Sequence, residues 1–218
     1  MNSKEAELIG MHTGDGTLYK TNSGSIVWEL RGSKEEKEYY SHISELLNSL
    51  FGVSLAPKER SGGLNGCYGI QTCNKAITRF FIEQGFKPGP KAHTAYIFDT
   101  VKNGNKTIKY SFIRGLFDTD GCLRFEKNRT KIRYYPRIEF GFASKNLRED
   151  LFNLLSSLGF KVYRWDDKDC LKLGLAGFEN LKRWMSKISP KNSKHLIRYS
   201  NWKKLSPDGP AVTAQISR

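Results

Sequence analysis

The first half of the chain shows two hydrophobic patterns in succession. Residues 26–31 ("IVWELR") alternate between apolar and polar side chains, which predicts a strand with one buried face. Residues 33–52 carry apolar side chains at helical spacing, which predicts a helix. Ser33 and Glu36 form its capping box, and Gly52 is its stop signal. The other elements expected in this half are strands at residues 53–60 and 67–72 and a helix that begins near residue 75.

The second half repeats this order. Residues 144–159 match residues 33–52 in pattern, with Ser144 as the N-cap and Gly159 as the stop. Strands are expected at residues 122–127, 131–143, 160–165 and 170–175, and a closing helix at residues 178–188. The sequence therefore predicts an α+β fold of two pseudo-symmetric tandem αββαββα repeats. We expect half-domains at residues 1–86 and 111–188, a linker rich in Pro, Gly and Lys at 87–110, and a C-terminal helix and tail at 189–218.

Charge adds a partner class to this picture. The chain has 36 Lys and Arg residues against 22 Asp and Glu residues, a net charge of +14. Such an excess favours a polyanionic partner. The basic residues are spread among aromatic residues along the expected strands instead of forming a tail or one basic helix, so we interpret the partner as a nucleic acid. No apolar run is long enough to cross a bilayer, and the N-terminus has no signal-peptide pattern, so we expect an intracellular protein.

An apolar, helix-sized run that ends in an acid and a glycine also occurs twice. The acids are Asp15 and Asp120, 105 positions apart. Small residues occupy matching positions, one turn apart, in the two runs: Gly10, Gly14, Gly115 and Thr119. Glycine weakens an isolated helix by about 1 kcal/mol, but it is useful where another backbone must come very close. Two such helices packed face to face would bring Asp15 and Asp120 side by side.

Paired carboxylates at two helix C-termini repel each other and oppose the helix dipoles. A bound divalent cation would remove both problems, and Mg²⁺ needs only one or two carboxylates together with waters and substrate phosphate. An acid pair in a basic protein therefore indicates phosphodiester hydrolysis on a polyanion. The alternative is that each Asp-Gly pair is an ordinary turn, which would be the better interpretation of a single copy.

These residues carry a family resemblance. Leu8–Gly16 ("LIGMHTGDG") and Ile113–Gly121 ("IRGLFDTDG") resemble the two signature motifs of single-chain LAGLIDADG homing endonucleases, and the likeness extends over nearly the whole chain. The first motif departs from the usual pattern at His12 and Thr13. The resemblance implies two half-domains whose curved antiparallel sheets form a saddle over DNA, with the motif helices at the central interface.

The resemblance also implies a mechanism. Asp15 and Asp120 would bind two or three Mg²⁺ ions, for which Mn²⁺ can substitute, helped by the backbone carbonyls of Gly14 and Thr119. Water would be the nucleophile, and each acid would serve cleavage of one strand across the minor groove, leaving short 3′ overhangs. Family members place a basic or polar side chain near each scissile phosphate. The corresponding residues here would be Gln71 in the first half and Gly174 or Lys172 in the second, of which Gly174 has no side chain for the task.

Alternating strand positions supply candidate DNA contacts. In residues 131–140, one face carries charged and polar groups that can pair with base edges in the major groove. The candidate DNA-binding residues are Glu29, Arg31, Lys58, Arg60, Arg124, Glu126, Arg133, Tyr135, Arg137 and Glu139. Any one of them alone would be interpreted as part of a solvated strand face. Trp28, Trp165 and Trp184 fall at apolar positions, which predicts core packing.

The sequence thus favours a monomeric, magnesium-dependent endonuclease, encoded within an intron, that cuts a long and partly palindromic double-stranded DNA site. The first alternative is an RNA-binding maturase on the same fold, acting on its own intron RNA with or without cleavage. The second is a transcription regulator that has lost catalysis, and retention of both acids argues against it. An intein origin is less favoured because no flanking splicing domain is recognisable. The compartment would be an archaeal or bacterial cytoplasm, or an organelle.

Overall fold

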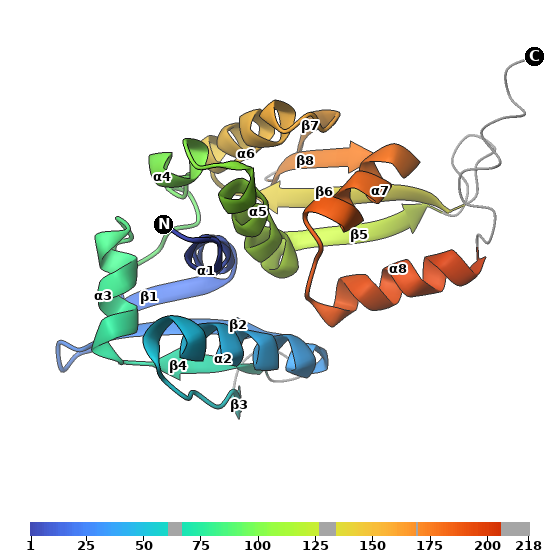
Figure 1. Cartoon of the computed structure of the whole chain (residues 1–218). Helices are drawn as coiled ribbons and strands as arrows, with labels where there is room; N and C mark the ends of the chain where they lie inside the picture. The colour runs from blue at the N-terminus through green and yellow to red at the C-terminus, as the bar shows by residue number, and fades with distance from the viewer. Residues whose placement is uncertain (61–66, 127–133, 169, 206–218) are drawn as a thin grey trace, which may run out of the picture.

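Two four-stranded antiparallel sheets form the framework of the protein (Figure 1). The computed structural model describes residues 1–60, 67–126, 134–168 and 170–205. The first sheet has the order β1 (Gly16–Lys20), β2 (Ile26–Gly32), β4 (Cys67–Thr72), β3 (Lys58–Arg60). The second has the order β5 (Gly121–Glu126), β6 (Tyr135–Phe142), β8 (Cys170–Ala176), β7 (Val162–Asp167). The same strand order in both halves confirms the predicted α+β tandem repeat.

Two helices lie side by side at the centre of the molecule. These are α1 (Ser3–Thr13) and α5 (Lys106–Asp120), which carry the two motifs (Figure 1). The others are η1 (Lys34–Glu36), α2 (Lys37–Phe51), α3 (Lys75–Glu83), α4 (Asp99–Lys102), α6 (Lys145–Ser157), α7 (Phe178–Lys187) and α8 (Ser193–Leu205). Within the described residues, no helix combines the length and the apolar character needed to cross a membrane.

The helix α5 begins earlier than the composition suggested. Asn105 is its N-cap, and the Asn105 side chain accepts a hydrogen bond from the backbone N–H of Ile108 at 3.0 Å. The last five residues of the stretch predicted as linker, 106–110, are therefore the first turn of the motif helix, and α4 occupies part of the same stretch. Residues 87–105 are rich in Pro, Gly and Lys, a composition typical of a linker. A helix can begin directly after such a loop when a capping residue is present, so composition alone does not locate the start of α5.

One predicted strand is shorter than expected. Residues 53–57 are not a strand, and β3 covers only Lys58–Arg60. The backbone carbonyl of Leu55 accepts a hydrogen bond from the Ser44 hydroxyl of α2 at 2.8 Å, and Leu55 packs against the core of this half. Pro57 cannot donate a ladder hydrogen bond, so pairing begins only after it.

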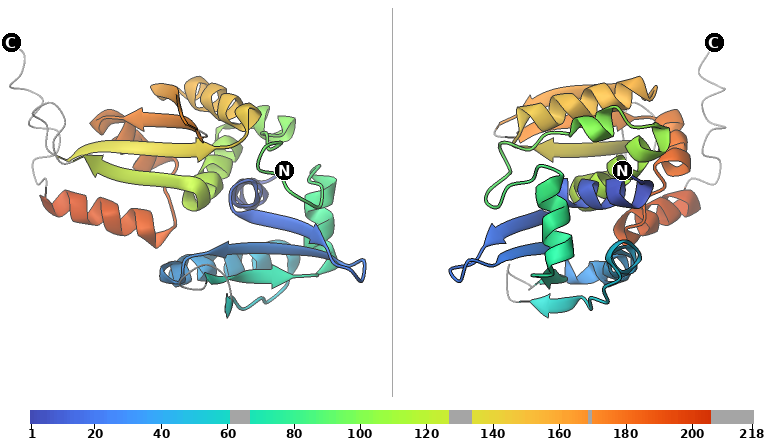
Figure 2. Two further views of the ribbon diagram at one scale, coloured as in Figure 1. Left: turned by 180° about the vertical axis from the view of Figure 1, so that it is seen from behind. Right: turned by 60° about the vertical axis from the view of Figure 1, so that its left-hand side comes forward.

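Each half has its own hydrophobic core, and α1 serves both. Leu8 and Met11 belong to the core under the first sheet, whereas Ala6 and Ile9 belong to the core under the second. Seen from behind (Figure 2, left), both sheets face the viewer, and α2 and α7 lie on their far sides. One broad face of the molecule is therefore lined by strands from both halves.

The strand faces follow the predicted alternation in β6 but not in β2. In β6, Ile138 and Phe140 are buried while Arg137 and Glu139 are only partly buried. In β2, Val27 and Glu29 are buried as well as Trp28, so both faces of this strand are covered. Trp165 also differs from the prediction. It lies on the face opposite the core, where its ring stacks on Tyr163 at a centroid distance of 5.2 Å.

Candidate active site

One glycine on each of the helices α1 and α5 packs directly against the backbone of the other helix. A Cβ atom placed on Gly10 would lie 2.1 Å from the carbonyl oxygen of Phe112, and one on Gly115 would lie 2.0 Å from the carbonyl oxygen of Glu7. Both obstacles are backbone atoms, which cannot move aside cheaply. The two helices therefore approach each other more closely than any residue larger than glycine would allow at these positions.

This close approach brings the two acids together. Asp15 follows the C-cap of α1 and Asp120 is the last residue of α5, and their carboxyl groups share a hydrogen bond. A Cβ atom on Gly14 would lie 2.1 Å from Thr119 Oγ1 and 3.3 Å from Asp120 Cγ, so these four residues form one tight cluster. The structure thus brings together the four residues that the sequence assigned to the metal site.

Burial perturbs the pKa of both carboxyl groups, and repulsion by Asp15 acts on Asp120 in addition. Burial, followed by the charge of Asp15, raises the pKa of Asp120 to about 7. Burial also raises the pKa of Asp15, against the opposing influence of Lys194 and of the hydrogen bond from Asp120. In the absence of a cation the pair therefore holds a proton near neutral pH. A pair of acids with raised pKa values at the surface of a concave face is typical of a functional site.

Two lysines that the sequence analysis missed complete this cluster. Lys91 Nζ donates to the backbone carbonyls of Thr13, at 3.0 Å, and of Gly14. Lys194 Nζ donates to the backbone carbonyl of Thr119 at 3.1 Å. Both ammonium groups act on the acid pair through their charge. The C-terminal end of each motif helix thus contacts one lysine. Burial lowers the pKa of Lys91.

A sequence signal for these lysines exists. Lys91 follows Asp15 by 76 positions and Lys194 follows Asp120 by 74. The two lysines therefore occupy nearly equivalent positions in the two repeats, as the two acids do. Both lie outside the periodic segments, Lys91 in the linker and Lys194 in the first turn of α8, so hydrophobic patterning alone does not single them out.

The donor atoms of the cluster suit a hard divalent cation. Asp15 and Asp120 offer carboxylate oxygens, and Gly14 and Thr119 offer carbonyl oxygens that are now bonded to the two lysines. Mg²⁺ prefers oxygen ligands and completes its shell with water and phosphate, so this set fits it. Across the described parts of the chain, no group of three or more His, Cys, Asp or Glu side chains forms a metal cage.

Gln71 and Lys172, the residues predicted near the scissile phosphates, lie on β4 and β8, one in each sheet. The Gln71 side-chain amide donates to the Tyr19 hydroxyl on β1. Lys172 lies on β8 opposite Gly141, and it lines a hollow on the second sheet. Gly174 lies opposite Glu139, and a Cβ atom there would lie 3.0 Å from the ring of Tyr163.

On the second sheet, four of the predicted DNA-binding residues form one ion-pair network. Arg124 lies 2.8 Å from Glu139, and Arg137 lies 3.0 Å from Glu139 and 3.1 Å from Glu126. Arg124, Arg137 and Glu139 line a hollow of about 450 Å³, together with Lys172, Tyr163 and Trp165. Tyr135 lies further along β6, where its ring packs edge-on against Phe178 at 6.0 Å.

On the first sheet the corresponding charges are fewer. Arg31 Nε lies 2.6 Å from Glu29, and Lys58 is opposite Gly69 at the edge of the sheet. The side chain of Arg60 and all of Arg133 lie outside the described residues.

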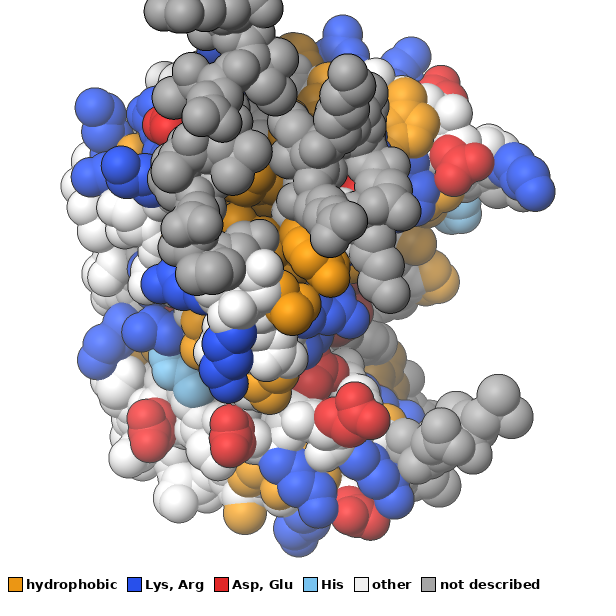
Figure 3. All heavy atoms as spheres, turned by 90° about the vertical axis from the view of Figure 1, so that its right-hand side faces the viewer, with side chains coloured by type: hydrophobic (Ala, Val, Ile, Leu, Met, Phe, Trp, Pro, Cys, Tyr) orange, Lys and Arg blue, Asp and Glu red, His pale blue; other side chains and the backbone are white. Residues whose placement is uncertain are grey.

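The two sheets place one cation and one glycine at equivalent positions, but in exchanged order. In the first sheet Arg31 on β2 is opposite Gly69 on β4. In the second sheet Gly141 on β6 is opposite Lys172 on β8. In the first sheet Lys58 on β3 is also opposite Gly69, so this row carries two cations in the first half and one in the second. Lys and Arg side chains are visible over both halves of the space-filling view, whose outline is notched between the halves (Figure 3).

The architecture and the acid pair define the class of protein: a single-chain protein of two αββαββα repeats that has the homing-endonuclease fold. The solved structure of variants of the homing endonuclease I-DmoI matches with a TM-score of 0.60 and 18% identity, over 87% of this chain and 97% of that one. I-SmaMI, bound to uncleaved DNA with calcium ions, matches with a TM-score of 0.64 and 12% identity, over 94% of this chain and 90% of that one. At these identities the likeness establishes the fold.

A family model matches the second half of the chain. Residues 107–189, which include the second motif, match the model described as LAGLIDADG-like domain. The resemblance is therefore confirmed by this match, and the chain as a whole has the homing-endonuclease fold.

Curated relatives share only a segment with this chain. The replication factor C small subunit of Methanocaldococcus jannaschii is 30% identical over 200 residues, which cover 84% of this chain and 11% of that protein. An uncharacterized protein of the same organism is 29% identical over 160 residues, which cover 71% of this chain and 16% of that protein. The chain thus spans about a tenth to a sixth of the length of these relatives.

Proposed function

We propose that this protein is a divalent-metal-dependent endonuclease that cuts both strands of a specific double-stranded DNA site. The observation that carries the proposal is the pair of hydrogen-bonded carboxyl groups of Asp15 and Asp120 at the seam of two strand-lined halves. The solved structures with the same fold include I-DmoI in complex with DNA and manganese, and I-DmoI in complex with DNA and calcium. Those complexes were formed by I-DmoI, and we extend the same partner class to this chain.

The chemistry follows from the residues at the seam. Asp15 and Asp120 would hold the metal through their carboxylates, with the carbonyls of Gly14 and Thr119 beside them. The bound divalent ion would supply an activated water and stabilise the charge on the leaving oxygen. Lys91 and Lys194 bring two positive charges next to the acids, and each is placed to stabilise a phosphate that approaches its own helix end. We therefore propose Lys91 and Lys194, in addition to Gln71 and Lys172, as the polar and basic groups near the scissile phosphates.

The strand-lined face would bind the DNA. In the second half, Glu126 and Glu139 hold the guanidinium groups of Arg124 and Arg137 in fixed orientations, which suits bidentate recognition of guanine. In the first half, Arg31 is held by Glu29 in the same way. Because the charged rows differ between the halves, we expect a target site whose two half-sites are related but not identical.

We propose a monomer because the acid pair is formed within one chain.

The genetic setting that we propose is an intron. The match to a short segment of a longer replication protein makes insertion within a host protein a second setting.

A randomised duplex library tests the proposal. The purified protein is incubated with the library and Mg²⁺, and the cut ends are sequenced. One defined site with staggered cuts is the expected result. Absence of cutting, together with tight binding to a structured intron RNA, would replace the proposal with the RNA-binding maturase.

The substitution Asp120→Asn isolates the catalytic acid. It keeps the shape of the side chain but removes the charge that binds the cation, so cleavage should fall by at least about 100-fold while DNA affinity changes little. The matched control is Asp99→Asn, because Asp99 is an exposed carboxylate at the start of α4. Strand-resolved cleavage and duplex binding are measured for both variants. Cutting of both strands by Asp120→Asn at the wild-type rate would remove Asp120 from the mechanism.

A further inference from the structure

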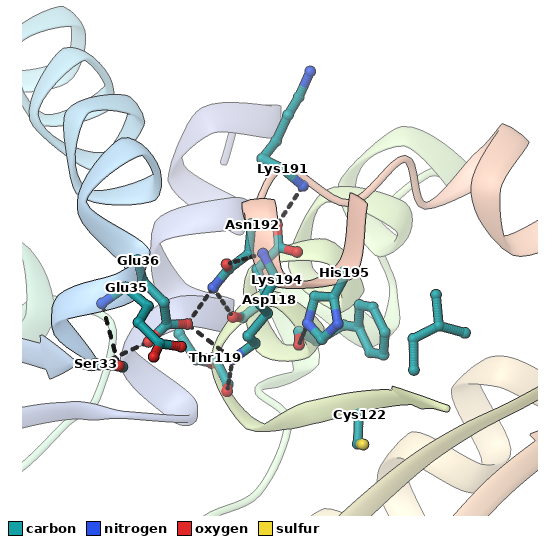
Figure 4. Close-up of polar contacts among 12 residues, drawn as sticks. Ser33, Glu35, Glu36, Asp118, Thr119, Cys122, Lys191, Asn192, Lys194 and His195 are labelled. Carbon is teal, nitrogen blue, oxygen red and sulfur yellow. Dashed lines mark hydrogen bonds and ion pairs between the residues drawn. The ribbon is translucent and has the colours of Figure 1, made fainter. Parts of the chain in front are cut away.

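We propose that Glu36, in the first half, is a positioning residue that holds Lys194 of the C-terminal segment at the end of α5, and that it thereby controls the cleavage of one DNA strand selectively. The inference rests on the proposed function and extends it to a residue outside both motifs. It starts from a cluster of polar contacts that joins η1 to the C-terminal segment and to the last turn of α5 (Figure 4).

Glu36 makes three contacts with its carboxylate. Its Oε1 atom accepts from Lys194 Nζ at 3.0 Å and from the side-chain amide of Asn192 at 2.6 Å. Its Oε2 atom accepts from the backbone N–H of Ser33 at 2.8 Å, which closes the capping box. The capping residue of the first half thus also binds two side chains of the C-terminal segment.

Both bound side chains continue to the second motif helix. Lys194 Nζ donates to the Thr119 carbonyl at 3.1 Å, and the Asn192 amide donates to the Asp118 carbonyl at 2.8 Å. Asn192 is 0% exposed, and its side-chain oxygen accepts from the backbone N–H of Lys194 at 3.1 Å. Glu36, Asn192 and Lys194 therefore connect the start of α2 to the last turn of α5.

The local backbone makes room for the Glu36 carboxylate. A Cβ atom on Gly32 would lie 2.6 Å from Glu36 Oε2 and 2.9 Å from the Tyr40 hydroxyl. The Glu36 side chain is only 12% exposed. A mostly buried carboxylate is stable only where hydrogen bonds and a cation satisfy it. Its three donors do so, and they fix its direction toward Lys194.

Lys91, the counterpart of Lys194, is held differently. Its ammonium group donates to the two backbone carbonyls at the end of α1. Among the described residues, no ion pair within 4.0 Å joins Lys91 to a carboxylate, whereas Lys194 has Glu36. The two halves of the active site are therefore unequal: loss of Glu36 removes an anchor from Lys194 and none from Lys91, while its charge also acts on Asp15.

Loss of Glu36 should therefore slow the cleavage of one DNA strand more than that of the other. If each lysine serves the phosphate near its own helix end, loss of Glu36 releases Lys194 and leaves Lys91 in place. Misplacement of one group by about 1 Å can cost up to about 100-fold in rate, so a partly released lysine should slow one cut by about tenfold. The product of such a variant is DNA nicked in one strand.

The test uses Glu36→Gln and a target duplex labelled differently on each strand. We expect one strand to be cut about tenfold more slowly and the other within about twofold of wild type. The slowed strand should be the strand that Lys194→Met slows, whereas Lys91→Met should slow the other. The matched control is Glu35→Gln, since Glu35 is exposed in the same turn and only its backbone N–H contacts Ser33.

A second variant moves the carboxylate without removing its charge. Gly32→Ala places a methyl group against Glu36 Oε2, the flexible end of the side chain, so the same strand should be slowed to a smaller extent. Equal slowing of both strands by Glu36→Gln, or no slowing, would overturn the inference while leaving the endonuclease itself intact. Failure of the wild-type protein to cut any duplex would instead reject the proposed function.

A measurement without metal or DNA tests the positioning directly. The full-length protein is treated with an amine-acylating reagent, and modification of each lysine is followed by mass spectrometry. In Glu36→Gln, Lys194 should react several-fold faster than in wild type, and Lys91 should react at its wild-type rate. Unchanged reactivity of Lys194 would show that Glu36 does not hold it.

Discussion

Directly behind the acid pair, His12 shows what burial does to a single residue. Its ring lies between Phe81 and Phe86, at centroid distances of 4.4 and 4.3 Å, and its Nδ1 atom accepts from Trp28 Nε1 at 3.1 Å. Burial, followed by the charge of Lys91, lowers the pKa of His12 to about 3. His12 is therefore a neutral core residue that fills the end of α1, despite its place inside the motif.

This neutral histidine predicts a loss of stability in acid. The folded pKa of about 3 lies below the unfolded value of 6.5, so the stabilisation is complete above pH 6.5 and is lost as the pH falls toward 3. Between pH 7.5 and 5.5, His12 should cost the wild type about 1.4 kcal/mol of unfolding free energy.

The measurement compares urea unfolding of wild type and His12→Gln at the two pH values. Glutamine does not titrate, so the stability difference between the two proteins should shrink by about 1.4 kcal/mol at pH 5.5. His195, whose pKa is also lowered to about 3 by burial, affects both proteins equally and cancels. An unchanged difference would mean that the buried ring accepts a proton.

Single residues differ in how readily the sequence reveals them. Asp15 and Asp120 were predictable because each ends an apolar run and has a copy 105 positions away. Lys91 and Lys194 were not, since they come from irregular segments where no period marks a face. Trp165 was assigned to the wrong face because β7 carries apolar residues on both faces, Val162 on one and Tyr163 and Trp165 on the other.

Among the secondary-structure elements, the pair α1 and α5 sets the geometry of the site. A Cβ atom on Gly115 would lie 2.0 Å from the backbone carbonyl oxygen of Glu7 in α1, and this oxygen cannot rotate away as a side chain could. The position of Asp120 relative to Asp15 therefore depends on this helix separation. Any substitution that widens the seam should also separate the acids.

Gly115→Ala tests this dependence. The added methyl group meets Glu7 O at 2.0 Å, and overpacking of this kind costs about 1–3 kcal/mol, against which alanine returns about 1 kcal/mol of helix propensity. Because the obstacle is backbone, we expect the upper end of that cost, a net loss of about 2 kcal/mol of unfolding free energy, and slower cutting of both strands. Thr107→Ala, at an exposed position of the same helix, is the control. A variant as stable as wild type would disprove the close packing.

Element order was predictable, but element ends were not. The repeated pattern gave both sheets, because alternation and helix spacing survive in each copy. The start of α5 depends on the side chain of Asn105, and the length of β3 depends on Pro57 and on a hydrogen bond from Ser44. Such local contacts are set by tertiary packing, which hydrophobic periodicity does not encode.

For the molecule as a whole, the excess of Lys and Arg residues that gives the net charge of +14 should make DNA binding sensitive to salt. Each phosphate neutralised by a lysine or arginine releases a counterion, so affinity should fall steeply as salt rises. Lys172 borders the hollow on the strand-lined face, whereas Lys182 lies on α7, on the other side of the second sheet. The two lysines are therefore suited to a matched comparison.

Lys172→Met should reduce the slope of log affinity against log salt by about 0.9, the effect of one phosphate contact. Lys182→Met should leave the slope unchanged. Binding of the target duplex is measured by fluorescence anisotropy in the Asp120→Asn background, which prevents cutting. Equal slopes for all three proteins would place the DNA elsewhere than on the hollow of the second sheet.

The contact between Glu36 and Lys194 has a practical consequence for protein engineering. Because the first repeat supplies the carboxylate and the segment after the second repeat supplies the amine, neither repeat carries a self-sufficient set of groups. A chimera that joins one repeat of this chain to a repeat of another enzyme would break this pairing. We expect such hybrids to recover balanced activity only when the residue at position 36 and the stretch from 191 to 195 are transplanted together.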